Sequence, residues 1–259
     1  MSAESSEPAV RYVAIGDSFT EGVGDELPDG AVRGWADLAA AGWADATGRT
    51  VQYANLAIRG KLVRPIVDEQ LERALALKPT HLSFNGGGND MLRPRTSIEH
   101  VLEAFLQVVR RCDDEGVTLI ILSGANPSAQ LPFGGLVNRR GDALSDAVVE
   151  RLAGRDDIVR ALNWYDRTLT HPSYWSADRL HMNARGHHRV AARVLGALGL
   201  DAPGEWWSLP ADAPAPALPR GEYFREHLAP WVRRRLTGRS SGDGREPKFG
   251  SWIDVAPRG

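Results

Sequence analysis

Residues 117–122 read Val-Thr-Leu-Ile-Ile-Leu, and this stretch decides the fold. Nearly continuous runs of branched apolar residues are typical of strands that are buried on both faces, as in the middle of a parallel sheet. Because parallel strands need crossover connections, helices normally cover both faces of such a sheet. We therefore expect helical segments on either side of this strand in the sequence.

Outward from residues 117–122, short apolar runs alternate with segments of helical periodicity. Further strands are predicted at residues 11–15, 51–56, 81–84 and 158–162, and helices at 34–47, 64–77, 96–114, 143–152 and 183–198. Thr96 and Glu99 form a capping box, and Asn183 is expected to cap the last of these helices. The alternation predicts an α/β protein, a three-layer α/β/α sandwich with a central five-stranded parallel sheet.

The composition is that of an ordinary globular protein, and it narrows the function classes. Of the 259 residues, 42% are hydrophobic and 25% charged, and the net charge of −2 lacks the basic excess typical of nucleic-acid binders. Cys112 is the single cysteine, which excludes an internal disulfide and a zinc site made of cysteines alone. There is no run of 18 apolar residues to span a membrane, and the acidic N-terminus is unlike a signal peptide, so we expect a cytoplasmic protein.

Residues 201–259 differ from the rest of the chain. They hold 8 of the 16 prolines and 4 of the 8 tryptophans, and tryptophans in a free tail would be costly to solvate. We therefore predict a core domain over 1–200 and a Pro-, Trp- and Arg-rich extension over 201–259 that packs on it and contains a helix at 221–236. Three arginines at 233–235 are expected to be solvated, or alternatively to contact an anionic acyl donor or the second subunit of a homodimer.

Three loops next to predicted elements carry polar residues that suit nucleophilic catalysis. Ser18 follows the first strand, Asn89 follows the third strand after glycines 86–88, and Asp178 and His181 precede the last core helix. A serine activated by an imidazole that a carboxylate orients attacks acyl groups, and an amide stabilises the resulting oxyanion. Taken singly, each has a plainer interpretation: Ser18 as a helix cap, the glycine loop as a flexible turn, and the spacing of Asp178 and His181 as chance. Ligands of parallel sheets bind beyond the carboxyl ends of the strands, so their joint occurrence favours one site.

The order and spacing of these residues resemble the GDSL family of serine esterases and lipases, also called SGNH hydrolases. The family's sequence blocks are matched by Gly-Asp-Ser at 16–18, Gly60, Gly-Gly-Asn-Asp at 87–90 and Asp-Arg-Leu-His at 178–181. Phe19 stands where the family name has leucine, at a position that varies. The resemblance covers residues 10–200, which would be the catalytic domain, and implies the SGNH, flavodoxin-like form of the sandwich.

The resemblance also implies a role for each matched residue. Ser18 would be the nucleophile, His181 its general base, and Asp178 the group that orients His181. The backbone amides of Ser18 and Gly60 and the side chain of Asn89 would form the oxyanion hole. Preorganised neutral donors stabilise an oxyanion without reorganising, so neither a metal nor a cofactor is implied.

Other titratable residues receive structural interpretations. His187 and His188 lie close to His181 in sequence, but no carboxylate cluster accompanies them, so a helix face is favoured over a metal site. Asp17 and Asp90 are expected to make hydrogen bonds within loops. Cys112 is expected to pack in the core and not to act as a nucleophile.

The predicted reaction is hydrolysis of a short- or medium-chain carboxylic ester through an acyl-serine intermediate. The main alternative is an O-acyltransferase that moves the acyl chain from acyl-CoA or another ester to a carbohydrate hydroxyl. Four tryptophans would then cover the site and stack on the sugar, or else pack in the core: Trp164, Trp175, Trp206 and Trp207.

Two further alternatives remain, neither of which is a serine enzyme. One is a catalytically inactive binding module of the same fold, which the presence of all the matched residues disfavours. The other is a nucleotide-binding α/β protein, which the lack of any phosphate-loop motif disfavours. The Gly-x-Ser-x-Gly elbow of the α/β-hydrolases is also missing.

Overall fold

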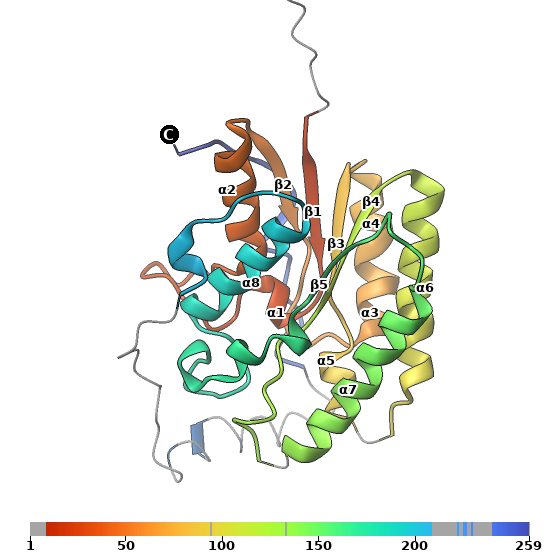
Figure 1. Ribbon diagram of the computed structural model, residues 1–259, viewed down its shortest axis with the longest axis vertical. Helices are drawn as coiled ribbons and strands as arrows, with labels where there is room; N and C mark the ends of the chain where they lie inside the picture. The colour runs from red at the N-terminus through yellow and green to blue at the C-terminus, as the bar shows by residue number, and fades with distance from the viewer. Residues whose placement is uncertain are drawn as a thin grey trace, which may run out of the picture.

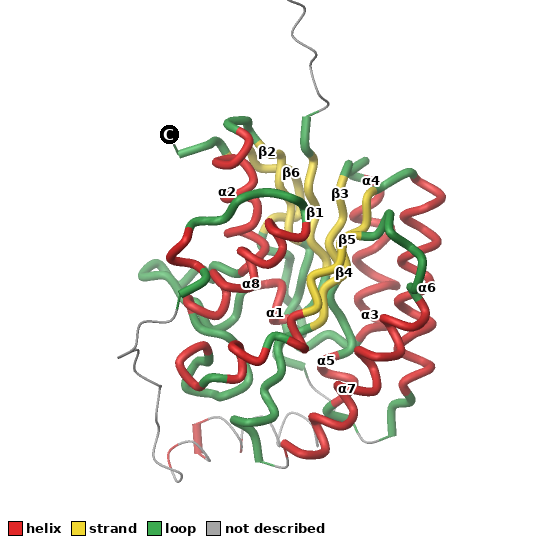
Figure 2. The backbone as a smooth tube through the Cα atoms, viewed as in Figure 1, coloured by secondary structure: helices red, strands yellow, loops and turns green. Residues whose placement is uncertain are grey.

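The computed structural model describes residues 9–93, 95–132, 134–208, 222, 225, 226, 229 and 240–258. Its centre is a six-stranded sheet with the strand order β5-β4-β3-β1-β2-β6 (Figure 2). The strands are β1 (Arg11–Ile15), β2 (Val51–Asn55), β3 (His81–Phe84), β4 (Thr118–Ser123), β5 (Val159–Leu162) and β6 (Phe249–Val255). The first five run parallel, whereas β6 pairs with β2 in the antiparallel direction.

The predicted sandwich and its five parallel strands are confirmed, but the prediction that these are the whole sheet is wrong. The sixth strand, β6, comes from the predicted extension, so the sheet continues past residue 200. Its sequence, Phe-Gly-Ser-Trp-Ile-Asp-Val, lacks the strict alternation of a half-buried strand. The ladder with β2 supplies hydrogen-bond partners that no local pattern reveals.

Helices cover both faces of the sheet (Figure 1). One face carries α2 (Trp35–Thr47) and α8 (Ala184–Ala197), and the other carries α3 (Val63–Ile66), α4 (Glu72–Ala76), α6 (Ile98–Glu115) and α7 (Gly134–Arg151). Strand β4 lies between the two layers. Leu119 and Ile121 pack in the core beneath α6 and α7, while Ile120 and Leu122 pack in the core beneath α2 and α8. This strand is buried on both faces, as its sequence predicts.

The helix ends follow local signals with some shifts. Asn183 caps α8 as predicted. Helix α6 is capped by Ser97 and not by Thr96, because the Ser97 side chain accepts a hydrogen bond from the amide of His100. Helix α7 begins at Gly134 and not at 143. The sequence does not predict this earlier start, because the first turns contain three glycines and lack a clear apolar stripe. The predicted helix 64–77 contains a π-helical segment, Val67–Leu71, between α3 and α4.

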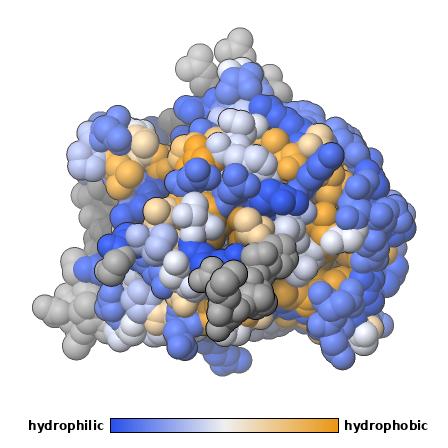
Figure 3. All heavy atoms as spheres, turned by 90° about the horizontal axis from the view of Figure 1, so that it is seen from above, coloured by the Kyte–Doolittle hydropathy of each residue, from blue (hydrophilic) through white to orange (hydrophobic). Residues whose placement is uncertain are grey.

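Two short helices begin where the direction of the chain connections reverses. They are α1 (Ser18–Glu21), which follows β1, and α5 (Gly88–Met91), which follows the neighbouring strand β3. The carboxyl edge at such a switch point is where open parallel sheets bind ligands. The opposite end of the molecule, seen from above in Figure 3, has a mostly hydrophilic rim.

Short 3₁₀ helices complete the fold at Asn163–Tyr165, Arg167–Thr170, Pro172–Tyr174 and Gly204–Trp206. The predicted helix over 221–236 and the arginines at 233–235 lie outside the described residues, apart from four isolated positions. In the part of the chain that the structure describes, no helix has the length and apolar character needed to cross a membrane.

Candidate active site

A tight turn places Ser18 at the carboxyl edge of the sheet. Gly16 is required there, because a Cβ at this position would lie 2.5 Å from the Oγ1 of Thr20. Gln70 holds the turn from the core: its Oε1 accepts from the Gly16 amide at 2.9 Å, and its Nε2 donates to the Gly16 carbonyl at 3.0 Å. Gln70 belongs to the π-helical segment, and such segments are frequent at functional sites. The backbone just before Ser18 is thereby fixed.

His181 lies within hydrogen-bonding distance of the Ser18 hydroxyl. The distance from His181 Nε2 to Ser18 Oγ is 3.0 Å, and that from His181 Nδ1 to Asp178 Oδ2 is 2.5 Å. The bond to the carboxylate favours the tautomer with its proton on Nδ1, which leaves Nε2 free to accept the serine proton. The structure thus brings the three predicted residues together from two loops.

The surroundings of Asp178 keep it ionised. Its Oδ1 accepts hydrogen bonds from Ser176 Oγ at 2.7 Å and from the amides of Leu180 and His181 at 3.0 and 2.9 Å. Burial by itself would raise the pKa of Asp178. The hydrogen bonds and the charge of His181 outweigh burial and hold this pKa well below its ordinary value. An ionised Asp178 is suited to stabilise an imidazolium.

Asn89 approaches the serine turn from the end of β3. Its side-chain amide donates to Asp17 Oδ2 at 3.1 Å and to the Lys61 carbonyl at 3.0 Å. The other oxygen of Asp17 caps α1 by accepting from the amide of Phe19 at 3.1 Å. One carboxylate therefore ties the Ser18 turn to the Asn89 side chain. Burial raises the pKa of Asp17 to about 6.

Gly60 lies in the loop that follows β2, with a positive φ of 76°. The preceding residue, Arg59, binds Glu21 at the end of α1. The Arg59 amide donates to Glu21 Oε2 at 2.6 Å, and its Nε donates to Oε1 at 2.9 Å. Hydrogen bonds therefore join the segments that carry Ser18, Gly60 and Asn89. They are made by Asn89 itself and by residues close in sequence to Ser18 and Gly60.

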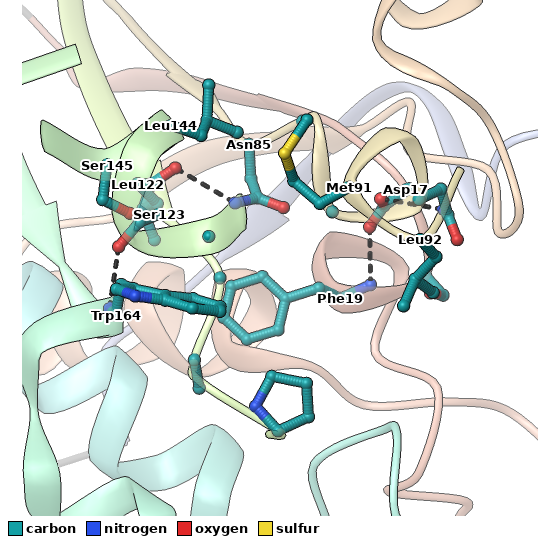
Figure 4. A pocket seen from close by; sticks show the side chains of 18 of the residues that line it. Asp17, Phe19, Asn85, Met91, Leu92, Leu122, Ser123, Leu144, Ser145 and Trp164 are labelled. Carbon is teal, nitrogen blue, oxygen red and sulfur yellow. Dashed lines mark hydrogen bonds between the residues drawn. The ribbon is translucent and has the colours of Figure 1, made fainter. Parts of the chain in front are cut away.

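A cavity of about 130 Å³ opens beside Ser18 and His181. Its walls are mainly apolar, and Figure 4 shows Leu144 and Trp164 on one side, Met91 and Leu92 on the other, and Phe19 between them. Further lining side chains are also members of the buried core beneath α6 and α7: Phe105, Ile121 and Val148. The cavity therefore reaches from the candidate catalytic residues into the apolar core.

The four tryptophans considered for the site divide into two pairs. Trp164 and Trp175 line the cavity. Trp206 and Trp207 pack against α8, where the Trp206 ring lies 5.1 Å from that of His188 and Arg189 lies over Trp207. Of these four, the first pair is placed to contact a substrate.

The histidines next to the site bind backbone groups. The amide of Trp35 donates to His187 Nδ1 at 3.1 Å, and burial lowers the pKa of His187 to about 4. His188 donates from Nδ1 to a carbonyl of its own helix at 2.7 Å. Cys112 is buried in α6, as predicted. Within the described ranges, no group of three or more His, Cys, Asp or Glu side chains is arranged to hold a metal ion.

Gln70, Glu21 and Arg59 are site residues that sequence reasoning missed. Gln70 carried a signal: it falls on the apolar face of the predicted helix 64–77, where a polar side chain must find a buried partner. Glu21 and Arg59 carried none, because their pairing depends on how two loops meet.

Comparisons with known proteins agree with this geometry. Residues 14–189 match the model of the GDSL-like Lipase/Acylhydrolase family. A search of curated protein sequences gives no match.

Among solved structures, the chain resembles the lipase Lip_vut3 from a goat rumen metagenome, with 18% identity and a TM-score of 0.60 over 73% of this chain and 97% of that one. It is similar to LAE5, an alpha/beta hydrolase enzyme from the metagenome of Lake Arreo, Spain (24% identity, TM-score 0.58, 74% and 97% covered). It is also similar to a catalytic mutant of Axe2, an acetylxylan esterase from Geobacillus stearothermophilus (18% identity, TM-score 0.61, 78% and 99% covered). These likenesses show the fold.

Proposed function

Because the chain belongs to the GDSL-like lipase/acylhydrolase family and is an enzyme of the serine esterase and lipase class, we propose that it hydrolyses carboxylic esters of short- or medium-chain acyl groups through an acyl intermediate on Ser18. One observation carries the proposal: His181 approaches the Ser18 hydroxyl to 3.0 Å beside an apolar cavity. A nucleophile, its base and a site for an acyl chain therefore meet at one point.

In the first half-reaction, Ser18 Oγ attacks the ester carbonyl carbon while its proton passes to His181 Nε2. The carbonyl oxygen becomes an oxyanion, which the amides of Ser18 and Gly60 stabilise. The side chain of Asn89 joins them by exchanging one of its two present acceptors, Asp17 Oδ2 or the Lys61 carbonyl, for the oxyanion. Asp178 stabilises the imidazolium. The ester C–O bond then breaks, and the alcohol leaves with the proton from His181.

In the second half-reaction, water attacks the acyl carbon and gives a proton to His181. The bond to Ser18 Oγ breaks, the proton returns to that oxygen, and the free acid leaves. A sugar hydroxyl in place of water would make the same machinery an acyltransferase. Trp164 and Trp175, which line the cavity, offer apolar surface to an acyl chain as well as to a sugar ring, so they do not decide the acceptor, and hydrolysis is the proposal.

The apolar walls favour an acyl chain in this cavity. Burial of each methylene contributes about 0.8 kcal/mol, which corresponds to about a fourfold gain in kcat/KM per carbon until the cavity is full. Val148 and Phe105, as members of the buried core, are expected to set that limit.

The test uses p-nitrophenyl esters of increasing chain length. Wild type should cleave them with kcat/KM rising and then levelling off, and Ser18→Ala should be inactive. Val148→Phe should reduce cleavage of the longer esters while sparing the acetyl ester. Val149→Phe is the matched control, since Val149 lies next to it on α7 but is exposed. An active Ser18→Ala, or an unchanged length preference in Val148→Phe, would contradict the proposal.

The same reactions run with candidate sugars and analysed by mass spectrometry decide the acceptor. Free acid as the main product supports a hydrolase. Acylated sugar formed in preference to free acid would overturn this choice in favour of the acyltransferase.

A further inference from the structure

The C-terminal segment, residues 240–255, packs on the loops that carry the proposed oxyanion donors. We propose that this segment is a positioning element of the active site, which holds the Gly60 loop and helix α1 in their reactive arrangement. The inference rests on the proposed function, because it concerns the oxyanion hole of that reaction. Its principal positioning residue is Lys248.

The start of the segment packs against the Gly60 loop at two glycines, Gly60 and Gly242. A Cβ on Gly60 would lie 2.3 Å from the Oγ of Ser240, and a Cβ on Gly242 would lie 2.1 Å from the carbonyl oxygen of Arg59. Only glycine allows this approach at either position. The segment therefore limits outward movement of the loop.

Lys248, just before β6, binds the end of the nucleophile helix. Its ammonium donates to the carbonyls of Glu21 at 2.8 Å and Val32 at 2.9 Å and to the Asp37 carboxylate at 2.6 Å. These contacts use all three donors of a lysine. The side chain is 13% exposed, so water competes little for them. Glu21 is the last residue of the four-residue helix that begins at Ser18.

Glu21 connects the two sets of contacts. Its carbonyl accepts from Lys248, while its carboxylate accepts from Arg59, the neighbour of Gly60. The pairing of β6 with β2 anchors the segment beside the strand that leads into the Gly60 loop, as Figure 2 shows. Helix α1, the loop and the segment therefore form one hydrogen-bonded unit.

The position of this unit matters for rate. A misplacement of about 1 Å can cost about 10²-fold in rate, and loss of one oxyanion donor costs about 10²–10³ in kcat. Removing the Lys248 ammonium weakens the contacts that hold α1 in place, but it leaves all the proposed oxyanion donors present. We therefore expect a loss of about 10- to 100-fold in kcat with little change in KM.

The experiment compares Lys248→Met, which keeps the apolar stem, with Lys248→Arg, which keeps the charge. Arg258→Ala is the matched control, because Arg258 lies three residues beyond the segment and binds Asp45 on α2 at 2.8 Å, away from α1 and the Gly60 loop. The measurements are kcat and KM for one p-nitrophenyl ester, the rate at which an organophosphonate labels Ser18, and the thermal melt. Lys248→Met should lose kcat and labelling rate in parallel, Lys248→Arg should recover part of both, and Arg258→Ala should keep both.

A folded Lys248→Met with wild-type kcat would overturn the inference, as would an equal loss in Arg258→Ala. If Lys248→Met does not fold, Gly242→Ala replaces it, since its added methyl presses on the Arg59 carbonyl and should give the same loss. An inactive wild type, or an active Ser18→Ala, would instead overturn the proposed function.

Discussion

Asp17→Asn is predicted to change how the stability of the protein depends on pH. Asp17 is 5% exposed, and burial raises its pKa from the ordinary value of 3.8 to about 6. A rise of about 2 pKa units corresponds to about 3 kcal/mol. Because the pKa is higher in the folded than in the unfolded protein, this contribution to stability is fully present below about pH 4 and is lost as the pH rises through about 6. Asparagine does not titrate, so the variant lacks this dependence.

The assay is urea unfolding of wild type and Asp17→Asn across this pH range. The free energy of unfolding of wild type, relative to the variant, is expected to fall by about 3 kcal/mol between about pH 4 and pH 8. Taking the difference cancels the titration of groups that do not interact with Asp17, and leaves only Asp17 and its charged neighbours His181 and Asp90. A difference that stays constant, or that grows with pH, would refute the assignment of a raised pKa to Asp17.

The same variant is also predicted to lose activity. An asparagine side chain has one acceptor oxygen, so it cannot serve both Phe19 and Asn89, and its own N–H groups would face other donors. We expect kcat to fall by about 10-fold or more, as for a disturbed oxyanion donor. Asp29→Asn is the matched control, since Asp29 also accepts a hydrogen bond from an amide two residues on, but in an exposed turn. Wild-type kcat in Asp17→Asn would show that Asp17 does not hold Asn89.

Three further predictions concern the groups around the serine. Ser18→Ala and His181→Ala should each lower kcat by about 10⁴-fold or more with unchanged circular dichroism. Asp178→Asn should lower kcat less than His181→Ala does, and the reverse order would argue against the assigned roles. Gln70→Leu leaves the buried amide of Gly16 without a partner, whereas the Gly16 carbonyl keeps the amide of Ile58 at 3.2 Å. We therefore expect a loss of about 1–3 kcal/mol in unfolding free energy together with a lower kcat, and wild-type values of both would show that the turn does not need Gln70. Activity should survive excess EDTA, because amide donors can stabilise the oxyanion, and recovery of lost activity by a divalent ion would contradict the serine-only scheme.

The catalytic and oxyanion-hole residues proposed for the site could be predicted from the sequence because each of their motifs is local. The Gly-Asp-Ser turn at 16–18, the glycines before Asn89 and the spacing of Asp178 and His181 each lie within a few residues of one another. The fold was equally accessible, since the 117–122 run and the alternation of strand and helix periods report burial directly. Such patterns depend on side chains that are neighbours in the sequence.

The tertiary structure alone decided which distant groups meet. Ser18 and His181 are 163 positions apart, and only the docking of two loops at the carboxyl edge brings them to 3.0 Å. The same holds for Gln70 at Gly16 and for Lys248 at Glu21, where a side chain serves backbone groups far away in sequence. The antiparallel β6 was hidden for the same reason. Its apolar and polar residues alternate only weakly, and it forms a strand because β2, at the edge of the parallel strands, offers unpaired amides and carbonyls.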